Sequence, residues 1–316
     1  MTPRAEISHE KRRVIARVAR RATADRVESE PLLRDVFRGE ISARTRVSSF
    51  RSLVWGYWKK EGRDLPWRKT RDPYKILVSE VMLQQTQVAR VIDTYVEFLR
   101  AFPTVRALSQ ASLVDILRVW SGLGYNRRAK FLHDAAREVV LKRKGIFPLS
   151  YEDWRALPGI GDYTAKAVRV FAFNQPEVLI ETNVRTVFIH YFFPHKKNIE
   201  DAQLLPLIEK ALVGQDPRGW YSALMDFGAH LKQLYPNPSR RSKHHVKQSK
   251  FKGSVRQVRG AILRALAAGP SVRFDSESLL SLLSLSSQDK KRLEDALDSL
   301  LKDGLIRQRG SRWVIS

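Results

Sequence analysis

Amphipathic runs of apolar and polar residues fill the middle of the chain, from Ser48 to about Tyr235. Short stops that contain proline or glycine interrupt these runs, at Pro66, Pro103, Gly122, Gly145, Pro158 and Pro176. The runs have the length of ordinary helices, and none shows the sustained alternation that is typical of a strand. The pattern therefore predicts an all-α core over residues 48–235.

Basic segments flank this core on both sides. The stretch from Glu6 to about Arg38 mixes Arg with Val, Ile and Ala at roughly helical spacing, which predicts a basic helical extension over residues 1–47. After the core, no acidic residue occurs between Asp226 and Asp275, and Lys and Arg are densest in residues 236–253. This second segment is predicted to be a cationic linker or arm.

The last part of the chain, residues 254–316, has a pattern of its own. The runs VRGAILRALAAG, SESLLSLLSL and DKKRLEDALDSLLKDG predict three helices, and LIRQ and RWVIS predict two short strands around Arg309-Gly310-Ser311. Three helices followed by a hairpin are the layout of a winged-helix module, although a generic helical bundle that ends in a strand pair has the same pattern. We expect a small winged-helix-like domain.

The charge balance points to an anionic partner. The chain has 57 Lys and Arg against 33 Asp and Glu among its 316 residues, a formal net charge of +24. An excess of this size creates a strong positive field and favours nucleic acid, with a ribosomal or membrane surface as the alternative. No apolar run approaches the roughly 20 residues that span a bilayer. We expect a soluble, intracellular protein, cytoplasmic or associated with the nucleoid, that does not bind a membrane.

The chain contains no cysteine. Disulfides, thiol nucleophiles and any cysteine-ligated zinc or iron–sulfur centre are therefore excluded. His244 and His245 are adjacent and project in different directions, so they are expected to belong to the solvated basic arm rather than to a metal site. No cofactor is expected.

A tight turn between two predicted helices is suited to phosphate binding. In LPGIGDYTAKAV, residues 157–168, Gly159 and Gly161 follow a proline and precede an Ala-rich helical run. Both glycines, together with Thr164 and Lys166 in that run, are expected to bind DNA. Glycines allow a tight turn whose amides point outward, and the following helix N-terminus attracts anions. Steric need alone would also explain glycine at such a turn.

These motifs together resemble the helix-hairpin-helix DNA glycosylases, and among them the MutY-type adenine mismatch enzymes. The family carries LPG-(I/V)-G at this turn, and further segments match its pattern in order: LPWR (65–68), DPYKILVSEVMLQQTQV (72–88), FPTVRALS (102–109), WSGLGYNRRAKFL (120–132) and MDFGA (225–229). The resemblance covers residues 48–235. It implies a two-lobed helical core and a base-excision enzyme that hydrolyses the N-glycosidic bond of a flipped, mispaired base.

Two carboxylates are candidates for this chemistry, because the leaving base needs a proton and the developing sugar cation needs negative charge. Glu80 is the candidate general acid, since its apolar neighbours in ILVSEVML are expected to raise its pKa. A helix-flanking Glu80 in water is the alternative. Glu181 stands where the family has Asp, in LIETNVRTV, and Asn183 is expected to orient a carboxylate or the attacking water. Glu181 is one methylene longer than the family's Asp, and such a shift can abolish catalysis in a preorganised site. The alternative is therefore an inactive site that is used only for binding.

Tyr163 indicates base removal without strand cleavage. The related enzymes that cut the backbone carry a Schiff-base lysine at this position, and Lys166, about one helical turn further on, is expected to be a solvated or phosphate-facing charge. A tyrosine at this position also occurs in some adenine and thymine mismatch enzymes of the superfamily, so Tyr163 does not select the base. Simple packing against the hairpin is its structural alternative.

Other residues resemble the family's DNA-inserting loops. Gln84 and Gln85 have amides that can pair with the orphaned base, and Tyr125 resembles the intercalating aromatic. Arg127 and Arg128 suit phosphates, with solvated surface charge as the alternative. Asn126 stands where family members often have a second tyrosine.

The resemblance has two gaps. Where the family has four cysteines for a [4Fe–4S] cluster, this chain has Lys232, Ser239, Ser242 and Gln248, and the basic arm is expected to replace the cluster's cationic loops. The C-terminal segment also differs from the family's domain that checks for 8-oxoguanine.

The favoured hypothesis is a monofunctional glycosylase, acting as a monomer on double-stranded DNA with a mismatch or damaged base. Adenine opposite guanine or 8-oxoguanine is the preferred substrate. A thymine or uracil mismatch glycosylase and a non-catalytic DNA-binding protein are the two alternatives.

Overall fold

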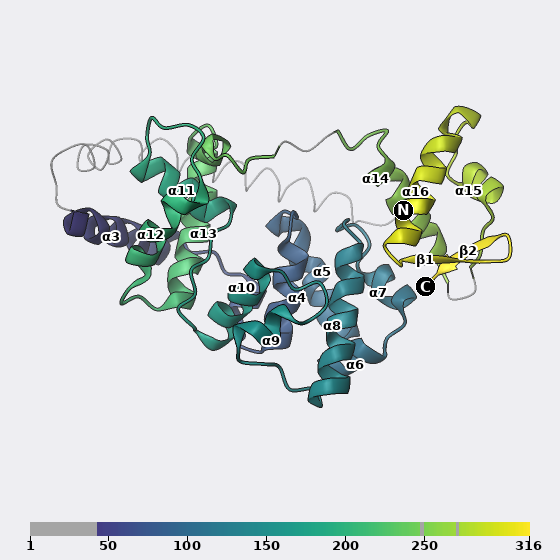
Figure 1. The fold of residues 1–316 in the computed structure, drawn as a ribbon, viewed down its shortest axis with the longest axis horizontal. Coiled ribbons are helices and arrows are strands. Elements are labelled where there is room, and N and C mark those ends of the chain that lie inside the picture. Colours follow the sequence, from purple (N-terminus) through teal and green to yellow (C-terminus); the bar gives the residue numbers. More distant parts are fainter. Residues whose placement is uncertain (1–42, 247–249, 270–271) are drawn as a thin grey trace, which may run out of the picture. The chain divides into compact units, whose positions relative to one another are not determined.

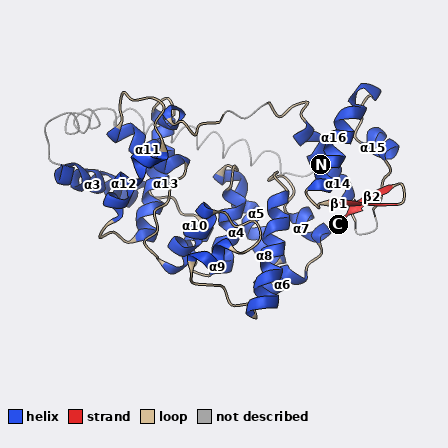
Figure 2. Ribbon diagram, viewed as in Figure 1, coloured by secondary structure: helices blue, strands red, loops and turns tan. Residues whose placement is uncertain are grey.

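The computed structural model describes residues 43–246, 250–269 and 272–316, so the predicted extension from Glu6 to Arg38 lies outside the described residues. Within these ranges the chain is helical up to residue 305 (Figures 1 and 2), and the predicted all-α core is confirmed. The elements of the central region are α3 (Ala43–Glu61), η1 (Pro66–Lys69), α4 (Pro73–Leu83), α5 (Val88–Ala101), α6 (Val105–Gln110), α7 (Leu113–Val119), α8 (Arg127–Arg143), α9 (Tyr151–Arg155), α10 (Asp162–Phe173), α11 (Thr182–Phe192), α12 (Asp201–Leu212), α13 (Pro217–Leu234) and η2 (Pro238–Arg241).

The C-terminal segment forms the elements that its pattern predicts. It contains α14 (Val255–Leu266), α15 (Ser276–Leu282), η3 (Ser287–Asp289), α16 (Lys290–Lys302), β1 (Ile306–Arg309) and β2 (Arg312–Ile315). The strands pair antiparallel with Arg309 opposite Arg312, and Gly310 takes φ +61°, a conformation that tight hairpin turns require. We call α14 to β2 the C-terminal module; its assignment as a winged helix stays a prediction.

The chain divides into two compact units. Among the described residues, unit 1 consists of 43–62, Glu181–Val213 and Ala223–His244, and unit 2 of Arg63–Ile180, Gly214–Ser222 and the described part of 245–316. This division follows contacts in space. The boundaries predicted from composition, 47/48, 235/236 and 253/254, divide the chain along the sequence and stay predictions.

Helix α4 forms the centre of unit 2. Asp72 caps it by accepting the N–H of Tyr74, and Pro73 occupies its first position, where a missing N–H costs nothing. The run from Ile76 to Met82 is buried without interruption, because α5, α8 and α10 all pack against α4. A helix with so many buried apolar residues is stable only in such an interior position.

Unit 1 has an aromatic core. The rings of Phe50 on α3 and Phe188 on α11 lie 5.1 Å apart, and Phe50 also contacts Tyr191 and Phe192. Tilted and edge-to-face pairs of this kind stabilise beyond the area that they bury. Arg51, next to Phe50, donates to the carbonyl oxygens of Lys210 and Val213 at the end of α12.

No helix among the described residues has the length and apolar character needed to cross a bilayer.

Candidate active site

Glu80 lies in the buried helix α4 of unit 2. Only 7% of its surface is exposed, and its neighbours Ser79 and Val81 are buried as well. The burial contradicts the alternative in which the carboxyl group sits in water beside a helix. A buried protonatable group is suited to deliver a proton to a leaving group.

Glu181 and Asn183 form the N-terminus of α11 in unit 1. Glu181 is the N-cap, and its Oε1 accepts the backbone N–H of Asn183 at 2.7 Å and of Val184 at 2.9 Å. The side-chain amide of Asn183 donates from Nδ2 to Oε2 of Glu181 at 3.3 Å. The longer arm of glutamate is thus folded back against its own helix, and both carboxylate oxygens have a donor that orients them.

The predicted hairpin is the turn between α9 and α10 in unit 2. Gly159 has φ +71°, and a Cβ atom at this position would overlap the ring of Phe131. Gly161 is the N-cap of α10 with φ −81°, and a Cβ atom there would point into open space. Glycine at 159 is therefore required by the fold itself, whereas glycine at 161 leaves the helix N-terminus open to a ligand.

Charged side chains surround this helix N-terminus. The hydroxyl group of Tyr151 donates to Asp162 at 2.6 Å, and this bond lowers the pKa of Asp162. Lys166 forms an ion pair with Asp162 at 3.0 Å and lies 5.7 Å from the centre of the Tyr151 ring. Lys166, the predicted phosphate-facing lysine, is thus paired with Asp162 of the same helix, and a phosphate would have to displace this carboxylate. Tyr163 is half-buried beside them.

The two predicted insertion loops meet at Arg128. Arg128 donates to the carbonyl oxygens of Val81, Met82 and Gln84 at the end of α4, and to that of Gly124 at 2.9 Å. It is buried, and desolvation lowers its pKa to about 10. The expectation that Arg128 binds phosphate is therefore wrong, because its guanidinium group satisfies carbonyl oxygens that the end of α4 leaves without intrahelical partners.

The tips of these loops carry the predicted inserting residues. Gln85 and Tyr125 are exposed and adopt left-handed backbone conformations, with φ +54° and +50°. Residues other than glycine rarely adopt this backbone conformation without a local reason, and such strain is frequent at functional sites. Gln84, in contrast, donates from its amide to Thr164 on α10 at 3.1 Å. Insertion of Gln84 into DNA would require exchange of that bond.

The C-terminal module contacts the same region of unit 2. Arg127, a predicted phosphate ligand, lies 3.6 Å from Asp303 and stacks on the ring of Phe131. Arg256 on α14 donates to the hydroxyl group of Tyr125 at 3.4 Å. The module thus brings one cation, Arg256, close to a predicted insertion loop.

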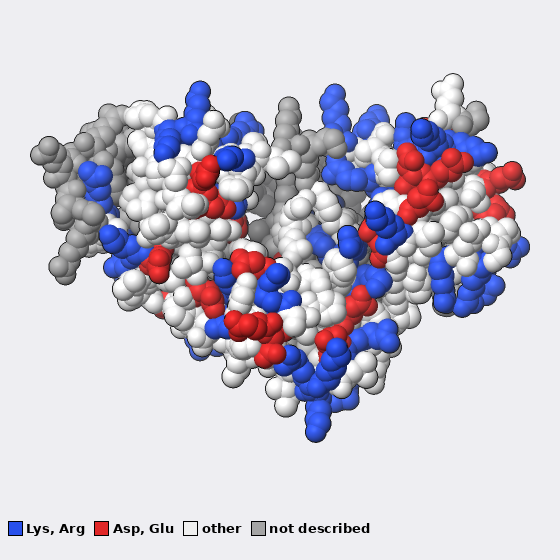
Figure 3. All heavy atoms as spheres, viewed as in Figure 1, with Lys and Arg blue, Asp and Glu red and all other residues white. Residues whose placement is uncertain are grey.

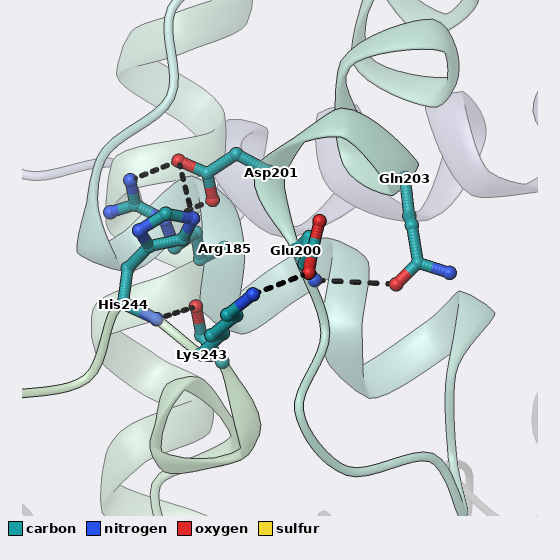
Figure 4. A network of polar contacts seen from close by, with 7 residues as sticks. Arg185, Glu200, Asp201, Gln203, Lys243 and His244 are labelled. Atoms are coloured by element: carbon teal, nitrogen blue, oxygen red, sulfur yellow. Dashed lines mark hydrogen bonds and ion pairs between the residues drawn. The ribbon is translucent and has the colours of Figure 1, made fainter.

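The segment in which the family pattern has cysteines contacts the end of α11, within unit 1, through polar groups. Arg241 donates to the carbonyl oxygens of Phe193 and Pro194 after α11, and Ser239 and Ser242 are buried. Figure 4 shows Arg185 and His244 directed at Asp201, and Lys243 directed at Glu200. Gln248 lies outside the described residues.

Lys232, at the first of these positions, donates to Asn183 at 2.7 Å. No group of three or more residues suited to hold a metal ion occurs in the described parts of the chain.

Comparison with known proteins agrees with these features. Residues 78–209 match the family described as "HhH-GPD superfamily base excision DNA repair protein". An adenine DNA glycosylase of Mycobacterium tuberculosis (strain ATCC 25618 / H37Rv) is 33% identical over 293 residues, which cover 84% of this chain and 92% of that protein. One of Mycolicibacterium smegmatis is 34% identical over 285 residues, covering 83% and 93%. The structure of a thermostable thymine-DNA glycosylase is 28% identical, with a TM-score of 0.53, and covers 60% of this chain and 88% of that one.

The chain therefore belongs to the HhH-GPD superfamily of base excision DNA repair proteins. The mycobacterial relatives that it matches over most of their length are adenine DNA glycosylases. Two features of its site were missed from the sequence, the interior position of Arg128 and the contact of Lys232 with Asn183. A signal for the second was present, because Lys232 follows Gly228 of the MDFGA motif by four residues and so shares its helix face.

Proposed function

We propose that this chain is an adenine DNA glycosylase that hydrolyses the N-glycosidic bond of a mispaired adenine in double-stranded DNA. The observation that carries this proposal is the 33% identity to an adenine DNA glycosylase over 293 residues. The family match at residues 78–209 includes Glu80, Glu181 and Asn183. We expect a monomer to act on each site.

The proposed chemistry assigns different roles to the two carboxyl groups. Glu80 donates a proton to a ring nitrogen of the flipped base, so that the base leaves as a neutral species when the bond to the sugar breaks. The ionised Glu181 stabilises the positive charge that develops on the sugar. Water then adds to the sugar carbon, loses a proton, and leaves an abasic site. Asn183 orients Glu181 through the hydrogen bond that its side-chain amide donates to Oε2.

Tyr163 supports a reaction that ends at the abasic site. A phenol cannot form the Schiff base through which an amine nucleophile leads to strand cleavage. Lys166, the nearby amine, is paired with Asp162. We therefore expect the DNA backbone to remain intact until alkali or another enzyme cuts it.

DNA is held, in this proposal, by the N-terminus of α10 and by the two loop tips. Phosphate approaches the backbone at Gly161, while Gln85 and Tyr125 enter the space left by the flipped base. Stacking on Tyr125 is tolerant of sequence. The opposite base would be recognised by contacts on the same side of unit 2.

A second substrate class has one observation in its favour. The thymine-DNA glycosylase structure is 28% identical to this chain, and the match covers 88% of the glycosylase chain. A thymine or uracil opposite guanine is thus the alternative target.

A panel of labelled duplexes tests the proposal. Each duplex carries one central pair, with adenine opposite guanine, 8-oxoguanine or cytosine, thymine or uracil opposite guanine, or a normal pair. Abasic sites are measured as strand breaks after alkali. We expect breaks at adenine in mismatches, none in normal pairs, and none before alkali.

Glu80→Gln is the control variant for this panel. Because it keeps the shape of the side chain and removes the proton donor, we expect excision to fall by about 10²–10⁴-fold while duplex binding persists. Excision of thymine or uracil instead of adenine would favour the alternative substrate. If the wild-type chain binds the duplexes and excises nothing, and Glu80→Gln binds them equally, the chain is a non-catalytic DNA-binding protein.

A further inference from the structure

A half-buried lysine contacts the candidate catalytic amide from the neighbouring helix. Nζ of Lys232 on α13 donates to Oδ1 of Asn183 on α11 at 2.7 Å, and both residues belong to unit 1. Burial lowers the pKa of Lys232, which the nearby carboxylate of Glu181 opposes. A partly buried ammonium group is costly unless it is paired, so this contact is the reason for its position.

The contact determines which way the Asn183 amide faces. An asparagine amide can turn by half a rotation, which exchanges its donor and acceptor ends. Lys232 is only a donor, so Oδ1 faces the lysine and Nδ2 faces Oε2 of Glu181 at 3.3 Å. With the amide reversed, two oxygen atoms would face each other at the carboxylate.

Helix α13 is built to come close to this point. A Cβ atom at Gly228 would overlap the carbonyl oxygen of Asn183, so only glycine allows the two helices to approach this closely. Lys232 lies four residues later on the same helix face and reaches the side chain of the same asparagine. Gly228 thus contacts the backbone of Asn183 and Lys232 its side chain.

We propose that Lys232 is a positioning residue for base excision, which orients the amide of Asn183 so that this amide donates to the carboxylate of Glu181. The inference rests on the proposed function, because Glu181 and Asn183 have their roles only in that reaction. Lys232 stands where the family pattern has the first cluster cysteine, and a thiol is too weak a donor to hold the amide in this way.

The first test compares three variants in single-turnover excision on the duplex from which the wild-type chain removes a base. Lys232→Met removes the donor, Lys232→Arg keeps a cationic donor, and Lys210→Met removes an exposed lysine of α12 in the same unit. We expect Lys232→Met to lower the excision rate by about ten- to a hundredfold, since small misplacements in a preorganised site cost this much. Lys232→Arg should keep most of the rate, and Lys210→Met all of it.

A merely structural role is separated by two further readouts. Duplex affinity and the thermal midpoint of Lys232→Met should stay close to those of the wild type. In addition, Lys232→Met should have no further effect on the rate in an Asn183→Ala chain, because the lysine acts through that amide. If Lys232→Met does not fold, the comparison of Lys232→Gln with Lys232→Arg replaces it.

Three results would overturn the inference. They are an unchanged rate in Lys232→Met, an equal loss in Lys210→Met, and effects of Lys232→Met and Asn183→Ala that multiply in the double variant. A wild-type chain that excises no base from any duplex is a different outcome, since it overturns the proposed function and removes the reaction that Lys232 would serve.

Discussion

At the residue scale, the two glycines of the turn between α9 and α10 are needed for different reasons. Gly159 has a left-handed backbone and lies against Phe131, whereas Gly161 has an ordinary backbone and open space around it. Where a glycine stands at a helix N-terminus although the backbone conformation does not require it, the absence of a side chain indicates that a ligand approaches the backbone there. Phosphate is the group that the proposed function brings to this point.

Gly161→Ala should therefore weaken DNA binding without harming the fold. We expect its thermal midpoint to equal or slightly exceed that of the wild type, because alanine restricts the unfolded chain. Its affinity for a duplex should fall by about tenfold, the loss of roughly one charge-assisted hydrogen bond. Fluorescence anisotropy and thermal unfolding measure the two quantities.

Gly159→Ala is the matched control for this experiment. It introduces the same methyl group two residues earlier, where it strains the backbone and overlaps Phe131. We expect a lower thermal midpoint for this variant. Equal affinity of Gly161→Ala and the wild type for DNA would show that the turn is steric only.

At the element scale, helix α8 carries two adjacent arginines in opposite surroundings. The side chain of Arg127 is 57% exposed and pairs with Asp303, whereas Arg128 is buried against the end of α4. The sequence places both at the start of a helix and gives no reason to separate them. Only the packing of α8 on α4 directs Arg128 inward, and this contact ties the loop of Gln85 to that of Tyr125.

Arg128→Met should destabilise the protein and Arg127→Met should not. Loss of the buried guanidinium group leaves the carbonyl oxygens of Val81, Met82 and Gln84 without their donor, at a cost of about 3 kcal/mol in the free energy of unfolding. The exposed neighbour should change it by less than about 0.5 kcal/mol. Chemical denaturation of the two variants measures this difference, and equal midpoints would contradict it.

At the scale of the whole molecule, the positive charge is unevenly distributed. In the C-terminal module Arg307, Arg309 and Arg312 are exposed on the hairpin, while α16 exposes Glu294, Asp295 and Asp298 beside its lysines. Figure 3 shows a cluster of acidic side chains in this region bordered by Lys and Arg, and a separate group of Lys and Arg away from it. A DNA backbone would therefore be attracted to the hairpin more than to α16.

The salt dependence of DNA binding tests this difference. Substitution of the three hairpin arginines by serine should reduce the slope of log K against log salt by about 0.9 for each lost phosphate contact. Serine at Lys290, Lys291 and Lys302 removes equal charge from α16 and should change the slope less, because neighbouring carboxylates already offset those lysines. Equal changes in the two variants would show that the total charge, rather than the hairpin, determines binding.

The sequence by itself determined the helices of the core, the glycine turn, the C-terminal hairpin and the family resemblance. These features depend on residues that are close together in the chain, such as Asp72 and Pro73 at the start of α4 or Gly310 at the hairpin turn. The absence of cysteine from the sequence also excludes an iron–sulfur cluster held by thiolates without reference to any structure.

The tertiary structure decided what the polar side chains of those motifs contact. Arg128 bonds to residues up to 47 positions away, and Lys232 to a residue 49 positions away. Local pattern carries no information on such pairs, because helical periodicity gives the face of a residue and leaves open which neighbour packs there. For this reason the sequence indicated the candidate catalytic residues, and the tertiary contacts showed that Arg128 of α8 holds the end of α4 and that Lys232 of α13 holds the amide of Asn183 on α11.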